Sequence, residues 1–161
     1  MEKTLGNLLI MKSLTISVAE SCTGGLIGHL ITSIPGSSAY FMGGIISYSN
    51  QSKCDLLGVS PATLEQFGAV SDQTAREMAI GVKEKLRSDI GISVTGIAGP
   101  DGGSVEKPVG TVFMGFAFDT KPFSIKYLFK GDRLEIKQQT AETTLENIRR
   151  HLNDDSFIPG I

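Results

Sequence analysis

The chain has 161 residues, a formal net charge of −2 and 40% hydrophobic residues, which suits one globular domain. Charges of both signs are mixed without a basic run, so the composition argues against a nucleic-acid-binding protein. Two histidines and two cysteines outside any CxxC pair argue against a structural zinc site, and we assign no metal ligand. No segment resembles a signal peptide or a transmembrane span, so we expect a cytoplasmic protein with reduced thiols and no membrane partner.

Apolar periodicity and turn-forming residues divide the chain into helices and strands. In chain order, we expect a helix over residues 2–12, a strand over 14–18, a helix over 26–34, and a strand over 40–48 with a bulge or a close backbone approach at Gly43-Gly44. Helices over 50–57, 60–68 and 71–87, a strand over 89–95, a hairpin of strands over 109–118 and 122–129, and a helix over 134–152 complete the order. Residues 153–161 are expected to fray. The pattern predicts a single α/β layered domain over residues 1–161, in which helices cover a mixed sheet of about five strands.

The stretch Ala-Glu-Ser-Cys-Thr-Gly-Gly, residues 19–25, lies where the first strand turns into a helix. The first N–H groups of a helix have no internal partner and carry partial positive charge, and glycines allow a ligand to approach the backbone. The Ser21 hydroxyl and an anion-stabilising group of N–H donors therefore share one turn. The alternative is that Ser21 or Thr23 caps the helix, and that Cys22 is a small, inert, buried thiol.

Polar residues crowd directly after the second expected strand, in the sequence Ser-Tyr-Ser-Asn-Gln-Ser-Lys of residues 47–53. Lys53 is the residue here that can act as a base toward a serine, provided that burial lowers its pKa. Tyr48 is a candidate to relay a proton or to orient the lysine. The alternative is a tyrosine at a strand exit and a solvated lysine on the surface.

A glycine-rich loop, residues 96–108, follows the strand over 89–95. It is not a Walker motif, because no Gly-Lys-Ser/Thr ends it, and no helix follows as in a dinucleotide fingerprint. Its N–H groups and the flanking Lys107 are candidate contacts for an anion. A flexible connection between strands is the alternative.

Five blocks, in order, resemble the CinA C-terminal domain family over about residues 5–152. They are residues 19–25, residues 47–50 with Lys53, Leu57-Gly58-Val59, Gly68-Ala69-Val70-Ser71, and residues 95–100 with 107–111. The resemblance is to the stand-alone form of the family, which includes nicotinamide-mononucleotide amidohydrolases. It implies hydrolysis of the carboxamide of nicotinamide mononucleotide to nicotinate mononucleotide and ammonia, without a cofactor. It also implies Ser21 as the nucleophile, assisted by Lys53 and Tyr48.

The remaining substrate contacts are assigned to the three loops. A carboxylate such as Glu20 is expected to help hold the cationic pyridinium ring, the N–H groups of residues 22–25 to face the oxyanion, and the glycine loop to bind the phosphate. The residues assigned in this way are Glu20, Cys22, Thr23, Gly24, Gly25, Asn50, Gly96, Ala98, Gly99 and Lys107.

Two functions remain open from the sequence. The first is the amidase, which the presence of Ser21, Tyr48 and Lys53 favours. The second is a non-catalytic module of the competence and damage-inducible family that senses a nucleotide or binds a partner. In either case we expect a small nucleotide as ligand and a homo-oligomer as the assembly.

Overall fold

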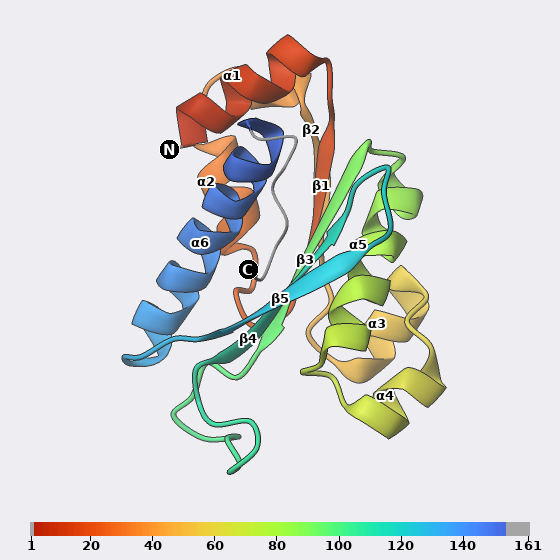
Figure 1. Ribbon diagram of the computed structural model, residues 1–161, viewed down its shortest axis with the longest axis vertical. Coiled ribbons are helices and arrows are strands. Elements are labelled where there is room, and N and C mark those ends of the chain that lie inside the picture. Colours follow the sequence, from red (N-terminus) through yellow and green to blue (C-terminus); the bar gives the residue numbers. More distant parts are fainter. Residues whose placement is uncertain (1, 154–161) are drawn as a thin grey trace.

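The computed structural model describes residues 2–153 of the chain and is built around one five-stranded sheet (Figure 1). Its strands are β1 (Ile16–Glu20), β2 (Phe41–Ile46), β3 (Ile90–Gly96), β4 (Thr111–Ala117) and β5 (Phe123–Leu128). Its helices are α1 (Glu2–Lys12), α2 (Leu26–Thr32), the 3-10 turn η1 (Ser37–Ala39), α3 (Asn50–Leu57), α4 (Pro61–Phe67), α5 (Asp72–Leu86) and α6 (Arg133–Asn153). The expected frayed tail lies outside the described residues, except for Asn153, which ends α6.

The sheet has the strand order β2-β1-β3-β4-β5. The first strand pairs in parallel with β2 and β3, whereas β3, β4 and β5 pair antiparallel. Figure 1 shows α1, α2 and α6 on one face of the sheet and α3, α4 and α5 on the other. The prediction of a mixed five-stranded sheet covered by helices is therefore confirmed.

The apolar character of the central strands β1 and β3 is explained by their burial. Every residue of β1 and the first six residues of β3 are buried, as expected for parallel strands covered on both faces. The apolar stripe of α5 packs tightly on this sheet, because glycines replace side chains beneath it. A Cβ atom at Gly91 would overlap the Ala79 carbonyl, and one at Gly115 would overlap the Ala75 carbonyl.

The strands differ in detail from the sequence-based ranges. The first strand runs two residues further than expected and includes Ala19 and Glu20. Its register with β2 shifts between Ile16 and Ser17, which skips Met42 and leaves the bulge beside Gly43, as the two glycines predicted. Among the described residues, no helix is long and apolar enough to cross a lipid bilayer.

The three loops singled out in the sequence meet at one edge of the sheet. Parallel strands end on the same side, so residues 21–25 after β1 and 47–53 after β2 lie together with the start of the loop after β3. The backbone joins them directly: Ser47 N–H donates to the Glu20 carbonyl at 2.8 Å, and Ser21 N–H donates to the Val94 carbonyl at 3.1 Å. This edge of the sheet carries the candidate site.

Candidate active site

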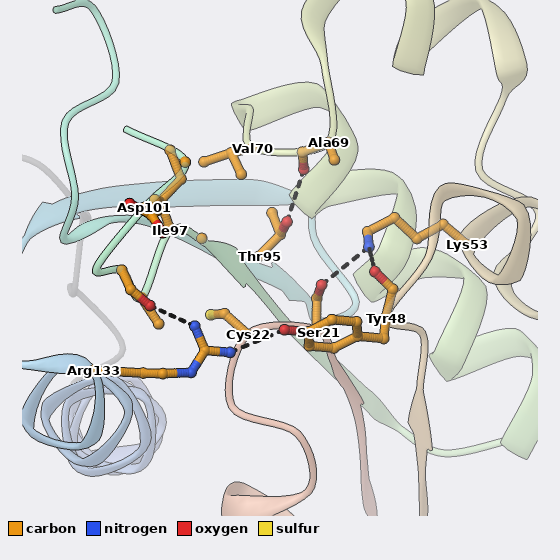
Figure 2. A pocket seen from close by; sticks show the side chains of 14 residues that line it. Ser21, Cys22, Tyr48, Lys53, Ala69, Val70, Thr95, Ile97, Asp101 and Arg133 are labelled. Atoms are coloured by element: carbon orange, nitrogen blue, oxygen red, sulfur yellow. Dashed lines mark hydrogen bonds between the residues drawn. The ribbon is translucent and has the colours of Figure 1, made fainter. Parts of the chain in front are cut away.

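A buried lysine contacts a buried serine at this edge. The Nζ atom of Lys53 donates a hydrogen bond to Ser21 Oγ at 3.0 Å, and the two residues are 1% and 8% exposed (Figure 2). Ser21 is held by the backbone at the end of β1. Lys53 lies in the first turn of α3, which Ser49 caps by accepting the Ser52 N–H at 3.0 Å. The structure therefore brings together two residues that are 32 positions apart in the sequence.

Two backbone carbonyls hold the rest of the Lys53 amine. Its Nζ atom also donates to the Ser47 carbonyl at 2.8 Å and to the Tyr48 carbonyl at 3.3 Å. Burial lowers the pKa of Lys53 below the ordinary lysine value, because a charged ammonium loses its hydration there. The lysine thus has the environment that a base toward Ser21 requires.

The neighbouring thiol has the opposite character. Cys22 is 6% exposed, and burial raises the pKa of its thiol to about 12. At neutral pH the sulfur is therefore protonated and weakly nucleophilic. Of the two adjacent candidate nucleophiles, the environment favours Ser21.

Glu20 lies in a different place from the one expected for a ligand of the substrate ring. Its buried carboxylate accepts the Thr23 hydroxyl at 2.6 Å and the N–H groups of Gly25, Ile27 and Gly28 at 2.8–3.1 Å. These contacts satisfy free donors at the start of α2. Glu20 and Thr23 therefore shape the turn from within.

The same contacts narrow the expected group of oxyanion donors. Gly24 N–H donates to the Ser21 carbonyl at 3.1 Å, and Gly25 N–H donates to Glu20. In the part of the chain that the structure describes, the N–H groups of Cys22 and Thr23 have no carbonyl or carboxylate acceptor. These two groups, next to Ser21, replace the four that the sequence suggested.

Tyr48 does not bridge the serine and the lysine through its hydroxyl. Its backbone carbonyl contacts Lys53, whereas its side chain is 62% exposed and its hydroxyl accepts a hydrogen bond from Arg133 at 3.0 Å. The other terminal nitrogen of the Arg133 guanidinium donates to the Gly99 carbonyl at 2.6 Å. Figure 2 shows this guanidinium between the glycine loop and the tyrosine.

Sequence reasoning missed Arg133. The apolar stripe of the last helix begins at Leu134, so the predicted helix excludes Arg133 and the sequence gives this residue no role. The structure makes it the first residue of α6 and directs its guanidinium to Gly99 and Tyr48 at the cavity. A lone arginine after Gly131-Asp132 carries no local signal of function, and only the packing of α6 brings it to the site.

These residues surround a cavity of about 270 Å³. The lining residues are Ser21, Cys22, Tyr48, Lys53, Ala69, Val70, Thr95, Gly96, Ile97, Ala98, Gly99, Asp101, Gly102 and Arg133. Seven of them were assigned from the sequence. The others come from the α4–α5 connection, from the end of β3 and glycine loop, and from α6.

Six assigned residues lie outside the lining: Glu20, Thr23, Gly24, Gly25, Asn50 and Lys107. Asn50 opens α3 and borders a separate surface hollow with Cys54. Lys107 donates to the Phe67 carbonyl at 2.9 Å instead of facing the cavity. Phe67 is followed closely by Ala69 and Val70, which line the cavity. These two residues belong to the block Gly68-Ala69-Val70-Ser71, to which the sequence assigns no role.

Fold and cavity together define an α/β protein with a serine–lysine pair at the carboxyl edge of its parallel strands. The chain belongs to the CinA C-terminal domain family, whose model matches residues 1–152.

Three relatives illustrate the range of the family. A putative competence-damage inducible protein of Halothermothrix orenii is 53% identical over 149 residues, which cover 92% of this chain and 36% of that protein. The nicotinamide-nucleotide amidohydrolase PncC of Enterobacter agglomerans is 52% identical over 147 residues, covering 91% of this chain and 90% of that protein. The crystal structure of the competence/damage inducible protein CihA from Agrobacterium tumefaciens is 43% identical with a TM-score of 0.87, and 95% of each chain is covered. The chain thus spans little more than a third of the first relative and nearly all of the second.

Proposed function

We propose that this protein hydrolyses the carboxamide of nicotinamide mononucleotide to give nicotinate mononucleotide and ammonia. The observation that carries the proposal is the 3.0 Å contact between buried Lys53 and Ser21 at the cavity. The relative of Enterobacter agglomerans, similar to this chain over nearly its whole length, is named for the same reaction. The activity of the longer relatives as whole proteins is not implied.

The amine geometry suits a neutral lysine acting as a base. A neutral amine has two N–H bonds and one lone pair. The ammonium form of Lys53 donates to Ser21 Oγ. In the neutral form, whose two N–H bonds remain on the Ser47 and Tyr48 carbonyls, the lone pair takes the place of that third N–H and accepts from the Ser21 hydroxyl. The lysine then accepts the hydroxyl proton as the serine oxygen attacks the amide carbon.

The turn after β1 supplies the charge stabilisation. The negative charge on the amide oxygen faces the N–H groups of Cys22 and Thr23, at the positive end of α2. The Lys53 ammonium then gives its proton to the leaving nitrogen, and the C–N bond breaks to release ammonia. A water molecule, deprotonated by the same lysine, hydrolyses the ester on Ser21 and yields the carboxylate product.

Two exposed charges of the cavity fit the rest of the substrate. Arg133 is a planar donor that suits a phosphate, and we assign it to the 5′-phosphate. Asp101 is the carboxylate among the lining residues, and we assign it to the cationic pyridinium ring in place of Glu20. Tyr48 lines the same cavity and contacts Arg133 through its hydroxyl, so it borders the proposed phosphate site.

Ammonia release from nicotinamide mononucleotide tests the function. The wild-type protein should release ammonia, and Ser21→Ala should lower kcat by about 10³-fold or more while the fold is unchanged. Ser33→Ala, the same substitution at an exposed serine, should release ammonia at the wild-type rate. Nucleotide binding without any ammonia release would favour the sensing module instead, and retained activity in Ser21→Ala would exclude the serine mechanism.

A further inference from the structure

One side of the cavity is formed by residues 67–70, which are the last residue of α4 and the three residues that follow it toward α5. Its last two residues, Ala69 and Val70, line the cavity. The Gly68 carbonyl accepts the Ser71 and Thr74 hydroxyls at 2.9 and 2.8 Å, and the Ala69 carbonyl accepts the Thr95 hydroxyl at 2.8 Å. Side chains of α5 and β3 therefore fix the end of this segment that leads into the helix.

The other end of the segment is held by Lys107. Its Nζ atom donates to the Phe67 carbonyl at 2.9 Å, across 40 positions of sequence. The same ammonium lies 3.7 Å from the position that a Cβ atom would take at Gly68. The lysine side chain thus lies directly against the backbone that leads to Ala69.

The backbone of Lys107 is in turn fixed to the glycine loop. Its N–H donates to Ser104 Oγ at 3.0 Å, and its carbonyl accepts the Ser104 N–H at 2.9 Å. This turn is part of the loop whose earlier residues, 97–99, 101 and 102, also line the cavity. Lys107 therefore connects the two loops that border the substrate.

We propose that Lys107 is a positioning residue: its ammonium ties the glycine loop to residues 67–70 and so sets the width of the cavity. One N–H bond of the ammonium is directed to the Phe67 carbonyl, and Lys107 is not among the residues that line the cavity, so this contact is distinct from substrate binding. The kinetic part of this proposal rests on the proposed amidase function, whereas its structural part does not.

Loss of the hydrogen bond between Lys107 and the Phe67 carbonyl should affect substrate binding more than the chemical step. The Ser21–Lys53 pair is held by the backbone of the parallel strands and by α3, none of which Lys107 touches. A loop that is less well ordered must be fixed when substrate binds, which weakens affinity. We therefore expect KM to rise about 3- to 10-fold in Lys107→Met, with kcat within about twofold of wild type.

The experiment combines hydrogen exchange with kinetics on the whole protein. In Lys107→Met, amide exchange in residues 66–71 and 97–107 should rise several-fold, because the contact that closes them is lost. Lys107→Arg keeps a donor and should restore slow exchange. Lys121→Met, at an exposed lysine of the β4–β5 turn, is the matched control and should leave exchange at the wild-type rate.

The kinetic readout compares nicotinamide mononucleotide with nicotinamide riboside, which lacks the phosphate. If Lys107 only connects the two loops, Lys107→Met should raise KM by the same factor for both compounds. Where turnover is slow, the inhibition constant should rise by that factor instead. A loss confined to the phosphorylated compound would make Lys107 an anion ligand and overturn the proposal. Unchanged exchange in both segments would overturn it as well, whether or not the protein releases ammonia.

Discussion

The two halves of the cavity are built by different means. The half that contains Ser21 and Lys53 is buried and is fixed by backbone hydrogen bonds between neighbouring strands. The half that contains Asp101 and Arg133 is exposed and is held by side chains that reach from loops and from the start of α6. The lysine of the first half is 1% exposed, whereas Tyr48 at the mouth is 62% exposed.

Under the amidase mechanism that we propose, this difference corresponds to two physical requirements. A lysine becomes a base near neutral pH only where water is excluded, so the reacting pair has to be buried and rigid. A charged substrate has to enter from water, so the charges that select it have to remain accessible. Mutations in the buried half should therefore alter turnover and its pH dependence, and those in the exposed half should alter affinity and selectivity.

The largest effect is expected at Lys53. Replacement by Met or by Arg should lower kcat/KM by about 10³-fold, because neither side chain can accept the Ser21 proton. In the wild type, kcat/KM should rise with pH as the lysine loses its proton. The midpoint should lie below 10.5, the ordinary lysine value, because burial lowers this pKa.

The Lys53 experiment measures kcat/KM across pH, with nucleotide binding followed separately. Lys121→Arg is the control and should reproduce the wild-type profile. Near wild-type turnover in Lys53→Arg would show that the residue acts as a fixed positive charge. The proton would then have another acceptor, and burial of the pair would need a different explanation.

An intermediate effect is expected at Arg133. Replacement by Met should lower kcat/KM for nicotinamide mononucleotide by about 10- to 100-fold, because a charge-assisted contact to the phosphate is lost. The riboside, which has no phosphate, should lose only a few-fold through the contacts to Tyr48 and Gly99. Arg150→Met, near the far end of the same helix, is the matched control. Equal losses on both compounds would remove the phosphate role.

The smallest effect is expected at Asp101. Its carboxylate is exposed, so its attraction to the pyridinium ring is weakened by solvent and salt. Asp101→Asn should raise KM about 3- to 5-fold at low salt and less at high salt. The inhibition constant of the reduced nucleotide, whose ring is neutral, should stay constant. Asp119→Asn serves as the control, and equal weakening of the charged and neutral rings would contradict the assignment.

Local patterns in the sequence were sufficient to predict the elements and to single out Ser21 and Lys53, which the structure brings into contact. Apolar β-branched runs predicted the buried strands, and a hydroxyl at a strand-to-helix turn predicted the position of Ser21. The two strands that precede Ser21 and Lys53 are parallel neighbours, so their ends were bound to meet once the sheet formed. The sequence blocks shared with the CinA C-terminal domain family pointed to the same residues.

Only the tertiary structure decided which polar groups face the cavity. Glu20 ends β1 and stands directly before Ser21, yet its carboxylate turns inward to N–H groups at the start of α2. Arg133 reaches the site because α6 packs across the sheet, and no local pattern encodes that packing. Side-chain direction at a turn depends on which partners are nearby in space. The sequence by itself therefore determined where Ser21 and Lys53 lie, and the packing of the loops and of α6 determined which polar groups surround them.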